Sequence, residues 1–506
     1  MITPLLFLAA AIAAPNPAPA KKAVPEPAKD GWAEAFALSK VDLPAGVDDQ
    51  VGGLAFLEDG RLAVALHRGE VFIRQTDGAW KQFAEGLHEP LGLLPDGQGA
   101  LLVMQRPELT RLEDTNGDGK ADRYRTVWDG FGMTGNYHEF AFGPARGPDG
   151  ALYVSLNLAS SGAGIFKEIR GTWSEIGKAT REQLASGKTG GAGRMYGRVP
   201  YRGCIVRIAD GGRGPAELFA TGFRSPDGIG FDGQGRLLVN DNQGDWRGSS
   251  PLQVVTKGSF NGHPASLVWS PGWDKGDPLA LPVPELEKLR TQPGGIFIQG
   301  ELSNSPTQPA VFPKSWGALA GQVVFGEMNA ARLVRFVGED IGGVHQGAMI
   351  PFLDTKTLRN GNHRMAFAPD GALHVGKTHL SWAGNNGIVR IEAPKALPPL
   401  IETVRLTPGG FEVRFTAPLA KASLAPALRS FRYKYHVAYG SPKVDELALE
   451  SAWSLSADGK ILTLPLKEVR AGFVHEIKLT GAKTLDGREL LGPIAYYQVV
   501  KLQGAR

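Results

Sequence analysis

The sequence predicts an all-β protein: a six-bladed β-propeller followed by a small C-terminal β-sandwich with an immunoglobulin-like pattern of strands. A chain of 506 residues exceeds the size at which one core usually stops growing, about 250–300 residues, so we expect two domains. Glycine supplies 67 of these residues, roughly twice its usual share of about 7%, which indicates many tight turns. A strand–turn–strand unit also recurs along the chain, and this repeat favours the propeller.

Each repeat unit has a short apolar strand, a turn containing Asp-Gly, and a second strand of alternating apolar and polar residues. The units are GGLAFLEDGRLAVAL from Gly52, PLGLLPDGQGALLVM from Pro90, FAFGPARGPDGALYVSL from Phe140, PDGIGFDGQGRLLVND from Pro226 and MAFAPDGALHVGK from Met365. Small antiparallel sheets that repeat roughly every 40–50 residues are typical of propeller blades. Insertions at 158–200 and 265–305 make the spacing uneven, and we count about six units over residues 41–393. A β-sandwich or several small β domains would be the alternative.

The N-terminal segment resembles a secretory signal peptide. Residues 5–14 are apolar, and the small residues after them include an A-x-A pattern that ends at Ala20. We therefore expect a signal peptide over residues 1–20, a Pro/Ala-rich linker over residues 21–40, and export to a periplasm or the cell exterior. The apolar stretch is too short to predict a membrane span.

A Pro-rich stretch at residues 394–399 separates the repeats from a C-terminal region with a different pattern. Residues 400–506 contain further alternating strands, such as TVRLTPGGFEVRF and FVHEIKLTG, but no repeat unit. This region is predicted to be the immunoglobulin-like β-sandwich. Cys204 is the only cysteine, so an intramolecular disulfide is excluded.

Composition and motifs argue against several function classes. The formal net charge is +4, and no basic run or aromatic-basic stripe supports a nucleic-acid partner. The chain has no G-x-S-x-G element, no P-loop and no H-E-x-x-H spacing, so hydrolase and nucleotide-dependent functions have no support.

Ionisable residues precede the first strand of several repeat units at a similar offset. These residues are His88 and Glu89, His138 and Glu139, Arg224 with Asp227, and His363 with Arg364. In a propeller the first strands surround one central channel, so such residues converge at its mouth and could transfer protons and bind anions. The alternative is that they satisfy backbone groups at strand ends. We favour that alternative for His88, and a functional role for His138 and Arg224.

A second candidate is the loop VNDNQGDWRGSSPLQVV at residues 239–255. Asp241, Asn242, Gln243 and Asp245 crowd around Gly244, which allows close approach of the backbone. An oxygen-rich loop of this kind suits a hard cation or several ligand hydroxyl groups. A simple Asx-rich turn would have the same composition.

A third candidate is the segment EDTNGDGKADRY, which has the spacing of a calcium-binding loop. Asp114, Asn116, Asp118 and Asp122 occupy positions 1, 3, 5 and 9, and the Lys120 carbonyl can serve at position 7. Position 12 is Arg125, where such loops usually have a bidentate glutamate. We predict a structural calcium ion here.

The segments NYHEFAFGPARGPDGALYV and GFRSPDGIGFDGQGRLLVNDNQGDW resemble the glucose/sorbosone dehydrogenase family. Members are quinoprotein six-bladed propellers that use pyrroloquinoline quinone (PQQ) and calcium. The resemblance covers about residues 45–393 and is strongest with a branch of exported bacterial dehydrogenase-like propellers, many of which carry a cytochrome c. This chain has no CxxCH motif for covalent haem, so an external electron acceptor would be needed.

The resemblance implies roles for individual residues. His138 stands where the family has the histidine that takes the proton of the substrate hydroxyl, and Arg224 matches the arginine that contacts the quinone. The turn Gln243–Gly244–Asp245 matches the loop whose backbone carbonyls hold the cofactor calcium. Asn329 stands where the family has a quinone-binding lysine, while His363 and Arg364 match the next contact only in part.

Two functions follow as hypotheses. The first is an exported quinoprotein-like oxidoreductase that oxidises a sugar or related alcohol or aldehyde with PQQ and calcium at the propeller mouth. The second is a non-catalytic, calcium-stabilised propeller that binds carbohydrate or another protein through the same mouth. Asn329 favours the second, whereas the set His138, Arg224 and Gln243 favours the first.

Overall fold

The computed structural model describes residues 30–189, 193–380 and 384–504, and strands dominate it, which confirms the predicted all-β class. The predicted signal peptide lies outside these residues. Among them, α-helices are short: α1 (Gly31–Ala35), α2 (Arg181–Ala185) and α3 (Val283–Leu289). Short 3-10 helices span Asp210–Gly212, Pro264–Trp269, Pro278–Ala280, Lys314–Leu319 and Lys421–Ser423. No described helix is long and apolar enough to cross a membrane.

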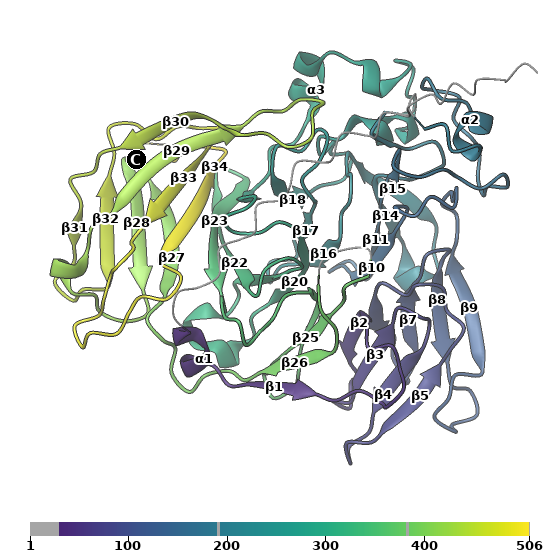
Figure 1. Ribbon diagram of the computed structural model, residues 1–506, viewed down its shortest axis with the longest axis horizontal. Coiled ribbons are helices and arrows are strands. Elements are labelled where there is room, and N and C mark those ends of the chain that lie inside the picture. Colours follow the sequence, from purple (N-terminus) through teal and green to yellow (C-terminus); the bar gives the residue numbers. More distant parts are fainter. Residues whose placement is uncertain (1–29, 190–192, 381–383, 505–506) are drawn as a thin grey trace, which may run out of the picture.

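The part of the chain between residues 38 and 391 forms six sheets of four strands, the fifth of which is extended further (Figure 1). The first has β2 (Val51–Phe56), β3 (Leu62–Leu66), β4 (Val71–Arg74) and β5 (Trp80–Ala84), and the second has β6 (Leu93–Pro95), β7 (Leu101–Met104), β8 (Leu109–Glu113) and β9 (Arg123–Trp128). The third has β10 (Ala141–Arg146), β11 (Leu152–Leu156), β14 (Cys204–Ile208) and β15 (Ala216–Thr221), and the fourth has β16 (Gly228–Phe231), β17 (Leu237–Asn240), β18 (Ser250–Val255) and β19 (Gly295–Phe297). The fifth has β20 (Pro306–Val311), β21 (Val323–Glu327), β22 (Leu333–Ile341) and β23 (Val344–Phe352), and the sixth has β24 (Asn362–Phe367), β25 (Leu373–Lys377), β26 (Ile388–Ile391) and β1 (Leu38–Val41). Within the first insertion, β12 (Ala159–Ser160) pairs with β13 (Met195–Tyr196).

The first strands of the six sheets contact one another in a closed cycle, from β2 through β6, β10, β16, β20 and β24 back to β2. Glycines make this close approach possible. A Cβ atom on Gly52 would lie 1.8 Å from the Pro90 carbonyl oxygen, and one on Gly92 would lie 1.6 Å from the Gly143 carbonyl oxygen. The glycine excess therefore serves close contact between strands as well as turns.

The sixth sheet takes its outer strand from the N-terminal side of the chain. Strand β1 pairs antiparallel with β26, from Leu38 opposite Ile391 to Val41 opposite Ile388. Before it, Trp32 and Phe36 are buried in an apolar cluster with Trp316 and other residues. The predicted linker over residues 21–40 is therefore wrong from Gly31 onward, because apolar side chains in this segment dock it against the last sheet.

The C-terminal region adds two further groups of strands. Strands β27 (Ile401–Thr407), β28 (Gly410–Phe415), β32 (Ile461–Pro465) and β31 (Ser454–Leu455) form one sheet, whereas β34 (Ile494–Val499), β33 (Phe473–Lys478), β29 (Ala427–Tyr433) and β30 (Lys443–Leu449) extend the fifth sheet. The extension occurs where β23 pairs with β34, at Ala348–Tyr497 and Met349–Tyr496. One buried apolar cluster, which includes Phe411, Val413 and Ile477, joins both groups of strands.

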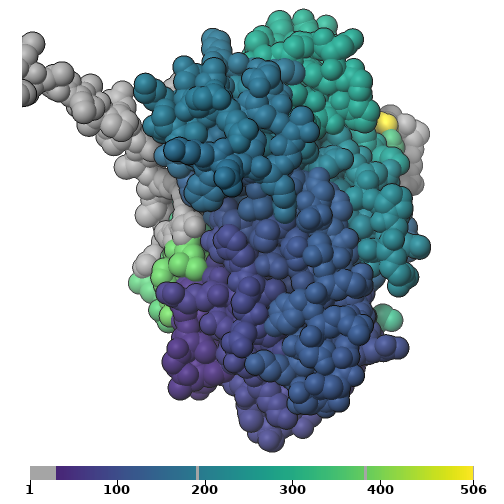
Figure 2. All heavy atoms as spheres, turned by 90° about the vertical axis from the view of Figure 1, so that its right-hand side faces the viewer, coloured from purple at the N-terminus to yellow at the C-terminus, as the bar shows by residue number. Residues whose placement is uncertain are grey.

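The connection between β29 and β30 reaches from the C-terminal region toward the centre of the molecule (Figure 1). The insertions that carry α2 and α3 rise at the same end of the sheets. Figure 2 shows the purple and blue N-terminal sheets below and the teal insertion segments above them. Three distant parts of the sequence thus meet at one end of the ring.

Candidate functional site

The ends of the ring strands surround a cavity of about 1180 Å³. Residues that precede a first strand line it, and so do residues that follow a second strand, as convergence at one mouth predicts. Lining residues from the six sheets include His67, Leu91, His138, Asn157, Arg224, Asn242, Ser305, Met328, His363 and Thr378. His88 is exposed and does not line the cavity, which agrees with its interpretation as a strand-end residue.

His138 presents one ring nitrogen to the cavity side. Its Nδ1 lies 2.8 Å from the Leu158 carbonyl oxygen, and because a carbonyl only accepts, Nδ1 carries the proton. The turn before it is held by Asn136, whose side chain accepts from the His138 N–H at 3.1 Å and donates to the Ser160 carbonyl at 2.8 Å. Burial, assisted by the charge of Arg224, lowers the pKa of His138 to about 4. His138 is therefore neutral at pH 7, with Nε2 as a hydrogen-bond acceptor.

The Arg224 side chain lies against Gly244 and pairs with Asp245, the next residue of the 241–245 loop. Its Nε donates to an Asp245 carboxylate oxygen at 3.2 Å, and its guanidinium carbon is 5.5 Å from the centre of the Tyr439 ring. A Cβ atom on Gly244 would lie 1.9 Å from the Arg224 Nε, so only glycine leaves room for this side chain. The close approach that Gly244 allows is therefore used by Arg224.

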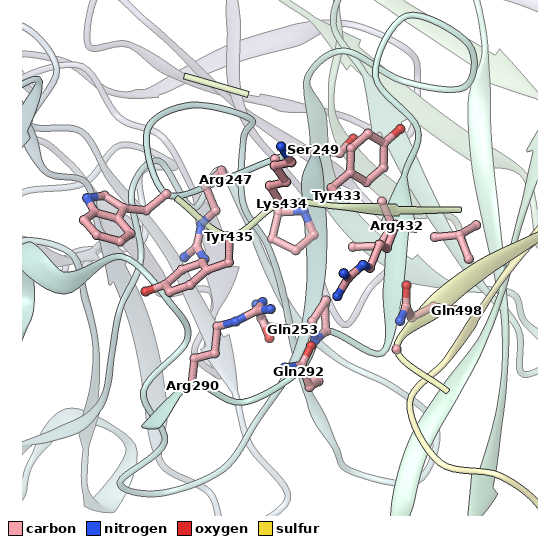
Figure 3. A pocket seen from close by; sticks show the side chains of 17 residues that line it. Arg247, Ser249, Gln253, Arg290, Gln292, Arg432, Tyr433, Lys434, Tyr435 and Gln498 are labelled. Atoms are coloured by element: carbon pink, nitrogen blue, oxygen red, sulfur yellow. The ribbon is translucent and has the colours of Figure 1, made fainter. Parts of the chain in front are cut away.

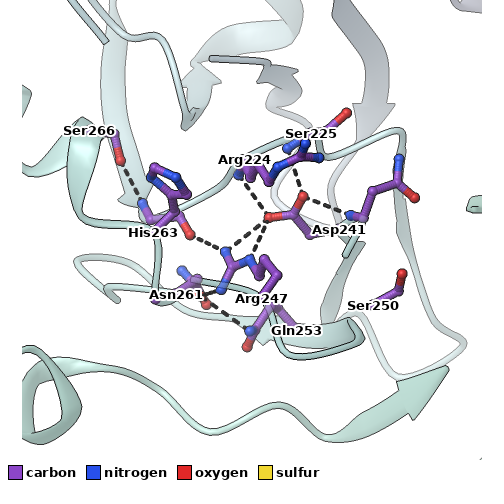
Figure 4. A network of polar contacts seen from close by, with 12 residues as sticks. Arg224, Ser225, Asp241, Arg247, Ser250, Gln253, Asn261, His263 and Ser266 are labelled. Atoms are coloured by element: carbon purple, nitrogen blue, oxygen red, sulfur yellow. Dashed lines mark hydrogen bonds and ion pairs between the residues drawn. The ribbon is translucent and has the colours of Figure 1, made fainter. Parts of the chain in front are cut away.

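Asp241 organises the turn that carries Arg224 (Figure 4). Its fully buried carboxylate accepts from the backbone N–H groups of Arg224 (2.8 Å), Ser225 (2.7 Å) and Asn242 (2.8 Å). The Arg247 guanidinium completes the set, with its nearest nitrogen 2.9 Å away. These contacts use both oxygens of Asp241, so this residue is a structural anchor.

Asp245, the second acid of the loop, is also ion-paired, with Arg224 and His263. The His263 ring accepts the Ala265 N–H at Nδ1 (3.3 Å), so its Nε2 donates to Asp245 across 3.1 Å. Although burial opposes ionisation, His263 and Arg224 hold the pKa of Asp245 below its usual range. The loop 241–245 therefore has the Asx-rich turn role that its composition also allowed.

The Gly244 carbonyl, expected from the resemblance to hold the cofactor calcium, accepts two backbone N–H groups. One comes from Arg247 at 3.1 Å, and the other comes from Gly440 of the β29–β30 connection at 2.9 Å. The guanidinium of Arg224 also packs on the other face of this glycine, where a divalent cation would be repelled. The residues present thus do not fit a calcium-held quinone at this loop.

His363 and Arg364, the other expected quinone contacts, are engaged between sheets. His363 lines the cavity, but its Nδ1 lies 3.0 Å from the Val51 carbonyl oxygen and its Nε2 lies 3.3 Å from Asp227. Arg364 donates to both Asp227 (3.0 Å) and the Gly52 carbonyl (3.1 Å). These two residues therefore tie the first, fourth and sixth sheets together across the ring.

Two further predicted positions differ from expectation. Asn329 does not line the cavity, although its neighbour Met328 does, and the Asn329 N–H donates to Glu327 at 2.8 Å. In the predicted calcium loop, Asp114 accepts from the N–H groups of Gly117 (2.7 Å) and Gly119 (2.8 Å).

The remaining polar side chains of that loop also accept within it: Asn116 from the Asp118 N–H, Asp118 from the Lys120 N–H, and Asp122 from Thr115. Over the described ranges, no three His, Cys, Asp or Glu residues group as metal ligands. These side chains thus form the turns of the loop, and the structural calcium ion stays a prediction.

The C-terminal region supplies cavity residues that the sequence did not indicate. Tyr433, His436, Tyr439 and Lys443 all line the cavity, as does Arg194 from the first insertion. A concentration of tyrosines between two strands, in FRYKYHVAYG, was the only signal. A second, small cavity of about 70 Å³ is lined by Arg290, Arg432 and Tyr435 among other residues (Figure 3).

Four residues that line the cavity each have one buried polar atom without a hydrogen-bond partner within the described protein. These atoms are Nδ1 of His67, Oδ1 of Asn157, Oδ1 of Asn242 and Oε1 of Gln299. Asn157 is 0% exposed and His67 is 7% exposed. Both side chains are otherwise fixed, Asn157 by donating to Ser225 Oγ (3.0 Å) and His67 by Thr378 Oγ1 (3.4 Å).

Comparison with known families finds a match to a domain of unknown function (DUF7133) over residues 75–198. Comparison with curated proteins finds no match. The solved structures that are similar include an oxidoreductase (glucose dehydrogenase) from Thermus thermophilus, with 19% identity, a TM-score of 0.47, and coverage of 71% of this chain and 100% of that one.

Two further similar structures are aldose sugar dehydrogenases. The PQQ-bound enzyme from Streptomyces coelicolor shows 16% identity, a TM-score of 0.45, and coverage of 73% of this chain and 99% of that one. The apo-form enzyme from Escherichia coli shows 14% identity, a TM-score of 0.43, and coverage of 71% and 99%.

Proposed function

We propose that this protein is an exported six-bladed propeller with a C-terminal immunoglobulin-like sandwich, and that its central cavity binds a small, hydroxyl-rich molecule of the sugar class. The observation that carries this proposal is the lining of the cavity, in which aromatic rings lie beside hydroxyl, amide and imidazole side chains. The Nε2 of His138 only accepts a hydrogen bond, because Nδ1 carries the proton. A ligand that supplies several hydroxyl groups suits such a wall.

Aromatic side chains support the same ligand class. Phe140, Phe142 and Tyr137 line the cavity beside His138, and Tyr137 is 50% exposed. A sugar ring presents C–H groups on its faces and hydroxyl groups at its edge. The aromatic surfaces suit the first, and polar side chains of the lining, such as His138 and Gln243, suit the second.

Within this site His138 accepts a hydrogen bond, and at need a proton, from one ligand hydroxyl. Its Nδ1–H is committed to Leu158, so the ring orientation and tautomer are fixed before the ligand arrives. With a pKa of about 4 the ring binds a hydroxyl group without being protonated at pH 7. Arg224, whose positive charge lowers that pKa, would stabilise an alkoxide formed at the same hydroxyl.

An oxidoreductase that acts on a sugar, alcohol or aldehyde is the second candidate, and the free Nε2 of His138 is the observation that favours it. PQQ would supply the hydride acceptor in that case, with calcium and an external electron acceptor. This candidate requires Gly440 to leave the Gly244 carbonyl, because that carbonyl is the expected calcium ligand.

Isothermal titration calorimetry against neutral sugars, polyols and sugar acids tests the proposal without any cofactor. His138→Ala should weaken binding roughly fivefold to a hundredfold, since it removes one hydrogen bond. Asn386→Ala is the matched control, because this exposed asparagine lies outside the cavity and should leave affinity unchanged. Absence of binding to every compound at millimolar concentration would refute the proposal.

A further inference from the structure

We propose that the ligand carries one acidic group, as sugar acids do, and that Arg194 binds this group at the cavity wall. The inference rests on the proposed function and names its substrate class. Six residues with a full charge line the cavity: Arg194, Arg224, Asp227, Glu301, Lys443 and Glu446. Their pairing shows which charge is left for a ligand.

The other residues of this set have ion-pair partners within the described protein, and Glu476 shares Arg429 and Lys443 with Glu446 and Glu301. Arg224 pairs with Asp245, and Asp227 pairs with Arg364. Lys443 pairs with Glu301 at 2.5 Å, and Glu446 pairs with Arg429 at 3.1 Å. Arg194 is thus the cation of this set that has no carboxylate partner within the described residues, so an acidic group on a ligand complements it.

Arg194 is held in place by a contact that leaves its hydrogen-bond donors available. Its guanidinium carbon lies 4.2 Å from the centre of the Tyr439 ring, a cation–π contact with the C-terminal region. A guanidinium that stacks on a ring keeps its N–H edges free, and these edges match the two oxygens of a carboxylate. Tyr439 is therefore a positioning residue for Arg194.

The backbone places Arg194 on the His138 side of the cavity. The Arg194 carbonyl accepts the Ser161 N–H at 2.8 Å, and Met195 pairs with Ser160 between β13 and β12. Ser160 in turn accepts from Asn136, the residue that fixes the His138 turn. One ligand can therefore contact Arg194 with its acidic group and His138 with a hydroxyl group.

Main-chain contacts fix Tyr439 itself. Trp246 donates its N–H to the His436 carbonyl at 3.1 Å, Gly440 donates to Gly244 at 2.9 Å, and Ser441 donates to Gly248 at 2.9 Å. Gly440 has a φ of +64°, and a Cβ there would lie 2.8 Å from Gln243 Nε2. The C-terminal region thus contributes a fixed part of the site, and Tyr439 links the two arginines Arg194 and Arg224.

The test compares galacturonate, its methyl ester and galactose as calorimetric probes of the wild-type protein. We expect the acid to bind roughly tenfold or more tightly than the two neutral compounds, as one charge-assisted contact provides. This preference should shrink as the salt concentration rises, because Arg194 is exposed. Arg194→Gln should remove the preference while keeping the neutral affinity, and Arg194→Lys should keep part of it.

Arg213→Gln is the matched control, because it removes the same charge from an exposed arginine that does not line the cavity. Tyr439→Phe should retain the preference for the acid, whereas Tyr439→Leu should reduce it, since only the aromatic ring holds Arg194. Thermal unfolding of each variant establishes that it is folded. Neutral sugars that bind as tightly as the acid, or an Arg194→Gln variant with an unchanged preference, would overturn the inference and leave the proposed function intact. If no probe binds at all, both are wrong.

Discussion

Replacing Asp241 by asparagine should strongly destabilise the protein, although the two side chains have nearly the same shape. Asp241 is fully buried, and its two oxygens accept three backbone N–H groups and the guanidinium of Arg247. In Asp241→Asn one oxygen becomes an NH₂ group, which then faces donors whichever way the amide is turned. Arg247, itself 5% exposed, loses its charged partner at the same time.

The expected loss of unfolding free energy is about 3–5 kcal/mol, the cost of breaking a buried ion pair by removing one charge. Urea denaturation followed by tryptophan fluorescence measures it through the shift of the transition midpoint. Asp149→Asn is the control: its partner is Arg207, with Asp149 37% exposed, and its loss should cost at most about 1 kcal/mol. The account of the 241–245 loop as a structural anchor would be refuted if Asp241→Asn and the control shifted the midpoint equally.

Two further predictions concern stability. Burial lowers the pKa of His67 to about 3 and of His138, His374 and His475 to about 4, whereas the unfolded chain titrates near 6.5. Since the unfolded state then binds more protons, the free energy of unfolding should fall as the pH decreases from about 6.5 to 4, and it should have its full value above this window. A His475→Gln variant should show a shallower decline in urea midpoints over that range. An identical slope would contradict the assignment. Gly92→Ala should lower the free energy of unfolding by about 1–3 kcal/mol or more, because its Cβ would lie 1.6 Å from the Gly143 carbonyl oxygen. The control Gly97→Ala should lower it less, because a Cβ there meets no atom within 4 Å and only the positive φ of 70° opposes the change. Equal thermal stabilities of the two variants would argue against the close contact of the ring strands.

Local sequence patterns predicted the parts of the fold that depend on neighbours in the chain. Alternating strands around Asp-Gly turns correctly indicated an all-β chain, because each hairpin is defined within about 15 residues. The N-terminal strand β1 was missed, since LSKV follows a Pro-rich segment and pairs only with β26, at the far end of the repeats. No short-range pattern encodes such a pairing.

The residues of the candidate site likewise fall into two groups, those that local sequence patterns indicated and those that they did not. His138 and Arg224 precede first strands and His363 lies at the start of β24, and this shared position in the repeat indicated all three, which line the cavity. His67 and Asn157 follow second strands, in LAVALH and LYVSLN, and a polar residue that ends an apolar run could have indicated them.

Arg194 and Tyr439 could not be predicted to lie together. They belong to an insertion and to the C-terminal region, and only the tertiary arrangement brings the guanidinium onto the ring. The acidic loop was open to two interpretations because its partners Arg247 and His263 follow it in sequence without any recognised spacing. The choice between a cation site and an ion-paired turn depends on the side chains that meet it in space.

The central claim is that the cavity, with the β29–β30 connection seated on Gly244, binds a hydroxyl-rich ligand directly. Paired calorimetric titrations of the wild-type protein test it most directly, one with galacturonate and galactose in the absence of cofactor, the other with PQQ and calcium. We expect sugar binding that is lost or weakened in His138→Ala and does not need quinone or calcium. Tight, calcium-dependent quinone binding, with sugar bound only afterwards, would contradict it.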